Sequence, residues 1–256
     1  MIALGLALLA LGSADFIAGG LSGTPRDRRH IARGLLASGL PLLALVTLSG
    51  GRWSACAYAL LALAGIATWL FVRRESAPPS DVRNEERRAS RAIAVFLLLL
   101  LALALLAPLA PCRPPRWLLR ALEGHPLPLF QATNAEALIA VLGILALLAA
   151  PANALIRAIL RASGTQIDRS AKRLRGGRTI GMLERWLIFG FALAGEPTAA
   201  ALVVSAKSLV RFPELQAART ATAEEGAQEI DHVTEYFLLG SLASWFVALV
   251  PAVVLR

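Results

Sequence analysis

The feature that most constrains this chain is a series of long apolar runs separated by short charged segments. Hydrophobic residues make up 57% of the 256 residues and charged residues 17%. A helix needs about 20 mostly apolar residues to cross the hydrocarbon core of a bilayer. The runs lie at residues 1–21, 34–49, 53–72, 92–110 and 135–156, in two arms between 178 and 211, and at 233–255. The sequence therefore predicts an all-α fold, a polytopic bundle of about eight membrane helices in one integral membrane domain, 1–256.

The first run contains one ionisable residue, Asp15. A cleaved signal peptide is an alternative interpretation, because Gly12, Ser13 and Ala14 resemble a small-residue cleavage site. No basic segment precedes the apolar run, however, so we interpret it as a spanning helix. An ionisable side chain at membrane depth suggests a functional role, or an ion pair that holds helices together.

The basic residues predict the orientation of the chain. If the N-terminus lies outside, the segments on the cytoplasmic side contain 20 Lys and Arg and the outer segments contain five. Cytoplasmic loops of membrane proteins are enriched in Lys and Arg. We therefore expect a bacterial cytoplasmic (inner) membrane protein with both termini outside. The basic loops 73–91 and 157–178 are expected in the cytoplasm, and in the first of them Ser80 or Asp81 is expected to cap a helix that continues into the fourth run.

The outer loop, residues 111–133, contains the short amphipathic sequence RWLLRAL at 116–122. This sequence is far too short to span a bilayer and is typical of a helix that lies along the membrane surface. At the end of the loop, Thr133 and Glu136 have the spacing of a capping box that opens the fifth run.

Residues 176–215 predict a helical hairpin that turns at Gly195, Glu196 and Pro197. Both arms are shorter than a full span, so a re-entrant hairpin is an alternative to two spans. If the chain folds back at Glu196, charges of opposite sign meet at equal depth. Arg178 then faces Glu214 at the base of the hairpin, and Glu184 with Arg185 faces Lys207. Gly177 and Gly181, four residues apart, are expected to let a neighbouring helix approach closely.

Three segments of the C-terminal third resemble a group of uncharacterised bacterial polytopic membrane proteins. They are GGRTIGMLER (176–185), AAALVVSAKSLVRFPEL (199–215) and EYFLLGSLAS (235–244). The resemblance implies a membrane location and no particular activity. Some members of the group carry His and Gln on either side of an Asp-Phe pair near the N-terminus. In this chain the pair is Asp15-Phe16, and Leu11 and Gly19 take the flanking positions.

The polar residues of the apolar runs predict one inner-leaflet layer of side chains with no net charge. Its members are Asp15, Glu184, Arg185 and Lys207, and we expect Glu184 and Lys207 to lie within ion-pairing or one-water distance. The sequence contains no nucleophile elbow, phosphate-binding glycine loop or zinc-binding His-Glu-x-x-His motif. Glu85-Glu86 lacks the Arg of an intramembrane-protease motif, since Ser90 stands there, and Asp231, His232 and Glu235 are more typical of a solvated acidic segment than of a metal site. We therefore expect no catalytic residues, cofactor or bound metal.

These features favour a non-enzymatic membrane subunit or scaffold that binds other membrane proteins or copies of itself within the lipid bilayer. The alternative is a small transporter or ion pathway that uses Asp15, Glu184 and Lys207. A membrane enzyme acting on lipid is a third possibility, and it would need acid and base groups paired at a common depth. The basic charge of the chain, +9 at pH 7, is explained by the positive-inside rule and does not indicate a nucleic-acid partner.

Overall fold

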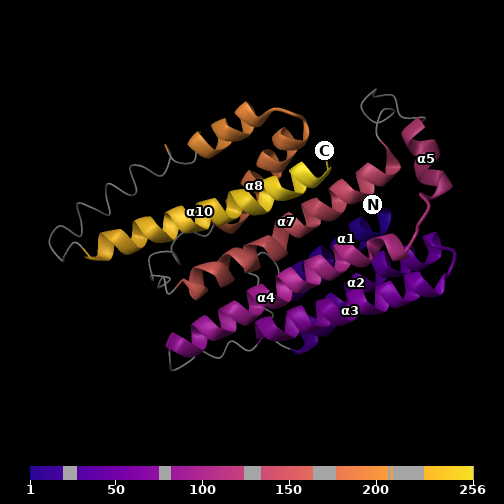
Figure 1. Ribbon diagram of the computed structural model, residues 1–256, viewed down its shortest axis with the longest axis horizontal. Coiled ribbons are helices and arrows are strands. Elements are labelled where there is room, and N and C mark those ends of the chain that lie inside the picture. Colours follow the sequence, from indigo (N-terminus) through magenta and orange to yellow (C-terminus); the bar gives the residue numbers. More distant parts are fainter. Residues whose placement is uncertain are drawn as a thin grey trace. The chain divides into compact units, whose positions relative to one another are not determined.

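The computed structural model describes residues 1–19, 28–74, 82–123, 134–163, 177–206, 209 and 228–255, and every regular element in these ranges is a helix (Figure 1). This confirms the predicted all-α class. Six helices are long and apolar enough to cross a membrane. They are α1 (Ile2–Gly19), α2 (Arg28–Leu48), α3 (Trp53–Arg74), α4 (Val82–Leu106), α7 (Ala135–Ala162) and α10 (Gln228–Leu255). The two hairpin arms are the shorter helices α8 (Gly177–Leu193) and Pro197–Ala206, so the described residues contain six candidate spans and not the expected eight.

The chain divides into two compact units. Unit 1 comprises Met1–Pro78 and Arg91–Pro151, and unit 2 comprises Pro79–Ser90 and Ala152–Arg256. The sequence by itself predicts one continuous membrane domain and gives no sign of this division. The reason is that apolar runs of similar composition do not specify which runs pack together.

Unit 1 is organised around α1, whose side chains are mostly buried. Small residues let its neighbours approach its backbone closely. A Cβ atom added at Gly12 would lie 2.6 Å from the Cβ of Ala146 in α7, and one added at Gly34 of α2 would lie 2.9 Å from the Cβ of Ala18. Both distances are shorter than real Cβ contacts, so these positions accept only glycine without a shift of the helices.

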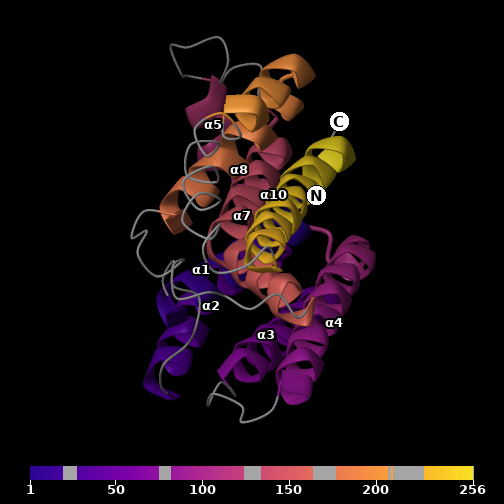
Figure 2. The ribbon, with the colours of Figure 1, turned by 90° about the vertical axis from the view of Figure 1, so that its left-hand side faces the viewer.

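Helices α3 and α4 lie side by side in unit 1 (Figure 2). The Tyr58 hydroxyl donates a hydrogen bond of 2.8 Å to the carbonyl oxygen of Leu103, which satisfies a polar group that would otherwise be buried alone. Nearer the other end of α3, the rings of Trp69 and Phe96 are 4.7 Å apart between centroids, in a tilted arrangement.

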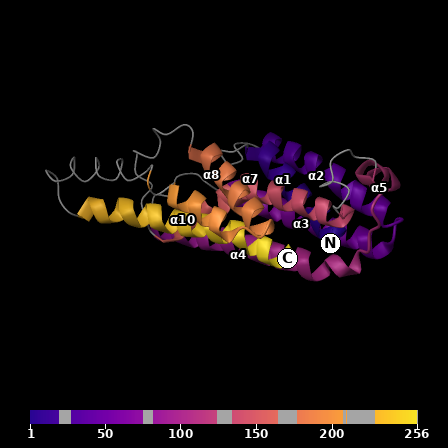
Figure 3. The same ribbon diagram turned by 90° about the horizontal axis from the view of Figure 1, so that it is seen from above.

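Unit 2 contains the hairpin packed against α10. Ile188 of α8, Ala200 of the second arm and Ala248 of α10 form its buried apolar cluster. Figure 3 shows α8 and α10 next to each other. The cluster joins both arms of the hairpin to one long helix.

Two tight turns end helices at glycine residues, and the sequence predicts the one at Gly195. Gly195, with φ of 85°, ends α8, and the Glu196 amide donates to the carbonyl of Phe191 at 2.9 Å. This is the Schellman arrangement, which needs a residue in the left-handed region and satisfies the last helical carbonyls. Gly50 and Gly51 end α2 in the same way, with φ of 71° and 70°.

Several helix ends differ from those predicted. Asn134, and not Thr133, caps α7: its carbonyl accepts from the amide of Leu138 and its Oδ1 accepts from the amide of Glu136, both at 2.9 Å. Asn is among the best N-cap residues because its short amide reaches the second free amide of the helix.

The expected basic loops 73–91 and 157–178 are shorter than predicted, since α3 continues through Arg74, α4 begins at Val82 and α7 ends at Ala162.

Candidate functional site

The first buried polar group of the molecule is an ion pair in unit 1. Asp15 lies near the C-terminal end of α1 and has no exposed surface, and Arg73, next to the last residue of α3, is 8% exposed. Nη1 of Arg73 donates to Oδ1 of Asp15. The chain runs along α1, back along α2 and forward again along α3, and this path brings the C-terminal ends of α1 and α3 to the same level.

Trp69 completes this arrangement. The guanidinium carbon of Arg73 lies 4.9 Å from the centroid of the Trp69 ring, one helical turn earlier in α3. A charged side chain buried alone costs several kcal/mol, and this cost falls when the opposite charge is supplied at hydrogen-bonding distance. The pair therefore allows Asp15 to remain in an apolar helix while it links α1 to α3.

Sequence reasoning missed Arg73 because it assigned this residue to a solvated loop. The signal that could have identified it is its spacing. Trp69 and Arg73 are four residues apart, on one face of a helix, at the end of the third apolar run. That end lies at the level of Asp15 when the first three runs are folded back on one another.

The second buried polar group lies in unit 2, where α7, α8 and α10 each contribute side chains. Arg185 is 2% exposed, and its Nη2 donates to Oδ1 of Asn153 at 2.6 Å while its Nη1 donates to Oγ of Ser244 at 3.4 Å. Nε1 of Trp245 donates to Oε1 of Glu184 at 3.4 Å. Glu184, Asn153 and Ser244 are buried as well.

This geometry links the three helices of unit 2. Two consecutive residues of α8, Glu184 and Arg185, contact two consecutive residues of α10, Ser244 and Trp245. Asn153 adds a contact from α7. The acid and the base are adjacent in sequence, so the cluster carries no net charge. Hydrogen bonds to an ionised group are the stronger kind, and they fix the rotation of α8 about its axis.

The structure places the predicted residues as follows. Glu184 and Arg185 belong to one cluster in unit 2, whereas Asp15 is paired with Arg73 inside unit 1. The other charged contacts predicted for the hairpin involve Lys207, Glu214 and the side chain of Arg178, which lie outside the described residues. The side chains of the acidic segment, Asp231, His232 and Glu235, also lie outside them. A single layer containing Asp15, Glu184, Arg185 and Lys207 stays a prediction.

The sequence predicts close helix packing at Gly177 and Gly181, whereas the structure shows it at other glycines. A Cβ atom at Gly181 would lie 3.6 Å from Nη1 of Arg185, in its own helix, and no other described atom is as near. Gly177 begins α8, and its packing lies outside the described residues. The close approaches of the described helices occur at Gly12 and Gly34 and also at Gly5 and Gly143.

Among the described residues, no group of three or more His, Cys, Asp or Glu side chains could hold a metal ion. Comparisons with protein-family models, with functionally described proteins and with solved structures found no match. The fold therefore defines the class of this protein by itself. In the part of the chain that the structure describes, every regular element is a helix, and six helices are long and apolar enough to cross a membrane, as expected of a protein embedded in a bilayer.

Proposed function

We propose that this chain is a non-enzymatic integral membrane subunit or scaffold, and that it binds other membrane proteins or further copies of itself. Its six apolar helices support a location in the membrane. Its candidate spans carry large exposed apolar side chains, such as Leu36 and Leu40 of α2 and Leu105 of α4, which can face lipid or a partner helix.

The observation that carries this proposal is that the buried charged side chains join helices to one another. Asp15 joins α1 to α3 through Arg73, and Arg185 joins α8 to α7 and α10 through Asn153 and Ser244. Side chains engaged in this way support a structural role, because each of them bonds to a side chain of another helix. A scaffold needs this rigidity, since its partners bind to helix faces whose rotation must be constant.

Isolation of the protein in discs of native membrane tests the proposal. We expect a second membrane protein, or a second copy of the chain, to be retained in constant stoichiometry. The Asp15→Asn variant leaves Arg73 buried without its counter-charge, and it should lose this companion together with thermal stability. Gly39→Ala is the matched control, because a Cβ atom at this exposed helical position meets no atom within 4 Å. A single copy of the chain that purifies without any companion would contradict the scaffold role.

A small transporter or ion pathway is the alternative, with Asp15, Glu184 and Lys207 as its charged residues. The observation that favours it is the burial of Glu184 beside Arg185 within the helices of unit 2, because buried ionisable residues in membrane helices often mark ion pathways. The two functions predict different results for Glu184→Gln. A transporter should lose flux in proteoliposomes while it keeps its melting temperature and any companion. A scaffold should lose stability, because the acceptor for Trp245 is changed and the charge next to Arg185 is removed.

A further inference from the structure

One end of unit 1 is closed by contacts between segments far apart in sequence. The turn between α2 and α3 lies beside the segment that joins η2 (Ala107–Leu109) to α5 (Arg116–Glu123). The Arg113 amide donates to the carbonyl of Leu48 at 3.2 Å, and Sγ of Cys112 donates to the carbonyl of Leu45 at 3.6 Å. Figures 1 and 3 both show α5 at this end of α2 and α3.

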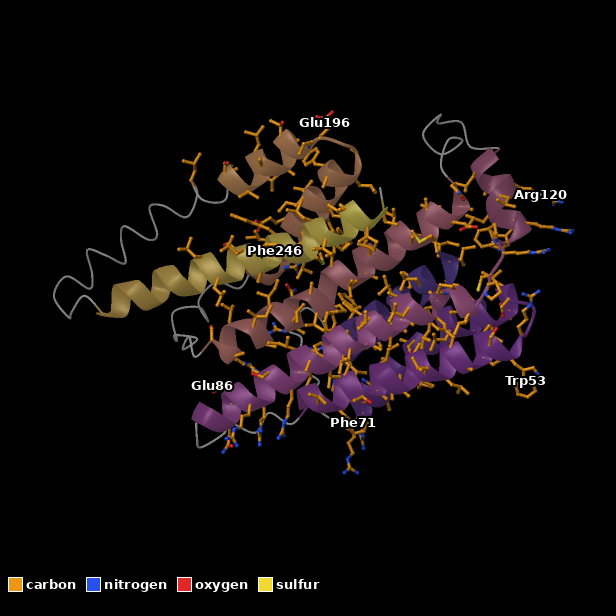
Figure 4. The ribbon with its side chains drawn as sticks, in the orientation of Figure 1. Trp53, Phe71, Glu86, Arg120, Glu196 and Phe246 are labelled. Carbon is orange, nitrogen blue, oxygen red and sulfur yellow. The ribbon has the colours of Figure 1, made fainter. Side chains whose placement is uncertain are left out.

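Four arginines and two tryptophans are exposed at this end, and we name them the arginine–tryptophan belt. Its members are Arg52, Trp53, Arg113, Arg116, Trp117 and Arg120. In Figure 4, Arg120 extends away from the helices at the same end of unit 1 as Trp53. The stretch 48–60 contains no Asp or Glu, and the stretch 107–123 contains one acidic residue, Glu123, at the end of α5. None of the four arginines forms an ion pair within the part of the chain that the structure describes.

The belt lies where candidate membrane spans begin and end. Three candidate spans begin or end here: α2 ends at Leu48, α3 begins at Trp53 and the α4 span ends at Leu109. Trp53 is 91% exposed and Trp117 is 70% exposed. Tryptophan is enriched at headgroup level, because its ring is apolar and its N–H needs a polar partner. Exposed tryptophans beside the ends of apolar helices therefore indicate contact with lipid headgroups.

The sequence of α5 carries an excess of positive charge, with two arginines and one glutamate. Arg116 and Arg120 are four residues apart and so lie on one face of the helix, where like charges repel. Leu122, in contrast, is buried against unit 1, which holds the helix in place. The guanidinium group presents a planar set of donors that matches a phosphate, and a phosphate between two arginines removes their repulsion.

We propose that the arginine–tryptophan belt binds the phosphate groups of anionic phospholipids, and that it selects them over zwitterionic lipids. Charge complementarity identifies the occupant: the four arginines outnumber Glu123, the one acidic residue of their two segments, and the excess positive charge attracts anions. The two tryptophans place those anions in the headgroup layer. The proposal is independent of the scaffold role. It also accounts for the position of α5, since the helix is held at the surface by lipid phosphates as well as by its apolar face.

Photo-crosslinking tests this binding site directly. The complete protein is reconstituted into vesicles that contain photoactivatable phosphatidylglycerol or photoactivatable phosphatidylcholine, and the labelled peptides are mapped. We expect peptides that contain Trp53 and Trp117 to be labelled more by phosphatidylglycerol. Each basic residue near an anionic surface contributes about fivefold to binding, so R52Q/R113Q/R116Q/R120Q should bring the ratio of the two labels close to unity. High salt should lower the ratio in the unchanged protein.

The control variant is R28Q/R29Q/R33Q, which removes three exposed arginines from the opposite end of α2. It should leave the labelling ratio at Trp53 and Trp117 unchanged. If the fourfold variant does not fold, R116Q/R120Q on exposed positions of α5 replaces it, with a smaller fall in the ratio expected. Equal labelling by both lipids in the unchanged protein would overturn the proposal and leave the belt to another occupant, such as an acidic segment of a protein. A ratio that survives the loss of the arginines would overturn it as well.

Discussion

Asp15 and Arg73 depend on each other because both are buried. In water either side chain would be stabilised by hydration, whereas in unit 1 each has the other as a charged neighbour. Removing one member of a buried pair leaves an uncompensated charge, and this costs more than removing both. The difference between the effect of removing both side chains and the sum of the two single effects therefore measures the interaction energy of Asp15 and Arg73.

We predict that Asp15→Asn and Arg73→Met each destabilise the folded protein by about 3–5 kcal/mol, and that the double variant D15N/R73M is less destabilised than the sum of the two. The measurement is the free energy of unfolding of all four proteins in the same detergent or lipid. Thr47→Ala, at an exposed position of α2 whose hydroxyl bonds only within its own helix, is the control and should change little. Additive effects of Asp15 and Arg73 would mean that the two side chains do not interact in the membrane.

At the scale of single helices, the packing of α1 depends on glycine. The apolar side chains of a membrane helix have a similar free energy in lipid and in contact with protein. The helix face that contacts neighbouring helices is therefore set by how closely the helices can pack. In α1 that face contains Gly12, which lies against Ala146 of α7.

We expect Gly12→Ala to destabilise unit 1 by about 1–3 kcal/mol, because overpacking moves helices that are already in backbone contact. The added Cβ would lie 2.7 Å from the carbonyl oxygen of Ala146. Gly39→Ala in α2 makes the same chemical change where nothing lies within 4 Å, and it should be neutral or slightly stabilising. Melting temperatures of the two variants provide the comparison. Equal melting temperatures would show that α1 and α7 do not pack as described.

The hairpin of unit 2 offers a second matched comparison. Gly195 has a φ of 85°, and an L-residue in this region costs about 1–2 kcal/mol. Gly195→Ala should therefore destabilise the turn between α8 and the second arm, which proteolysis near the turn would detect as faster cleavage. Gly190→Ala is the control, since this glycine is helical and an added Cβ meets nothing within 4 Å. Faster cleavage of the control than of Gly195→Ala would rule out a special role for the turn.

At the scale of the whole molecule, the distribution of basic residues predicts which ends of the helices face the cytoplasm. In a background without Cys56 and Cys112, Ser163→Cys and Ser80→Cys should react with a membrane-impermeant thiol reagent only from the cytoplasmic side. Ser54→Cys, at the exposed start of α3, should react only from outside. This follows from 20 basic residues on one side against five on the other. Reaction of Ser163→Cys from outside would invert the predicted orientation.

The sequence determines the local features of this protein. Long apolar runs predict the six candidate spans, because helix is the structure that satisfies backbone polar groups in lipid. Gly195-Glu196-Pro197 predicts the hairpin turn, because left-handed backbone and a helix start are properties of those residues themselves. The cap of α7 is Asn134, one residue after the predicted Thr133, because both residue types are suitable caps and the spacing to Glu136 favours Thr133.

Only the tertiary structure decides which polar side chains meet. Arg73 reads as a loop residue in the sequence, and Asn153, Ser244 and Trp245 read as ordinary members of apolar runs. The sequence does predict that their partners, Asp15, Glu184 and Arg185, belong to a polar layer, because a charge in an apolar run is costly wherever it lies. The choice of partner depends on the rotation and the neighbours of each helix. A run that is apolar on every side does not encode this choice, because lipid and protein interior favour the same side chains.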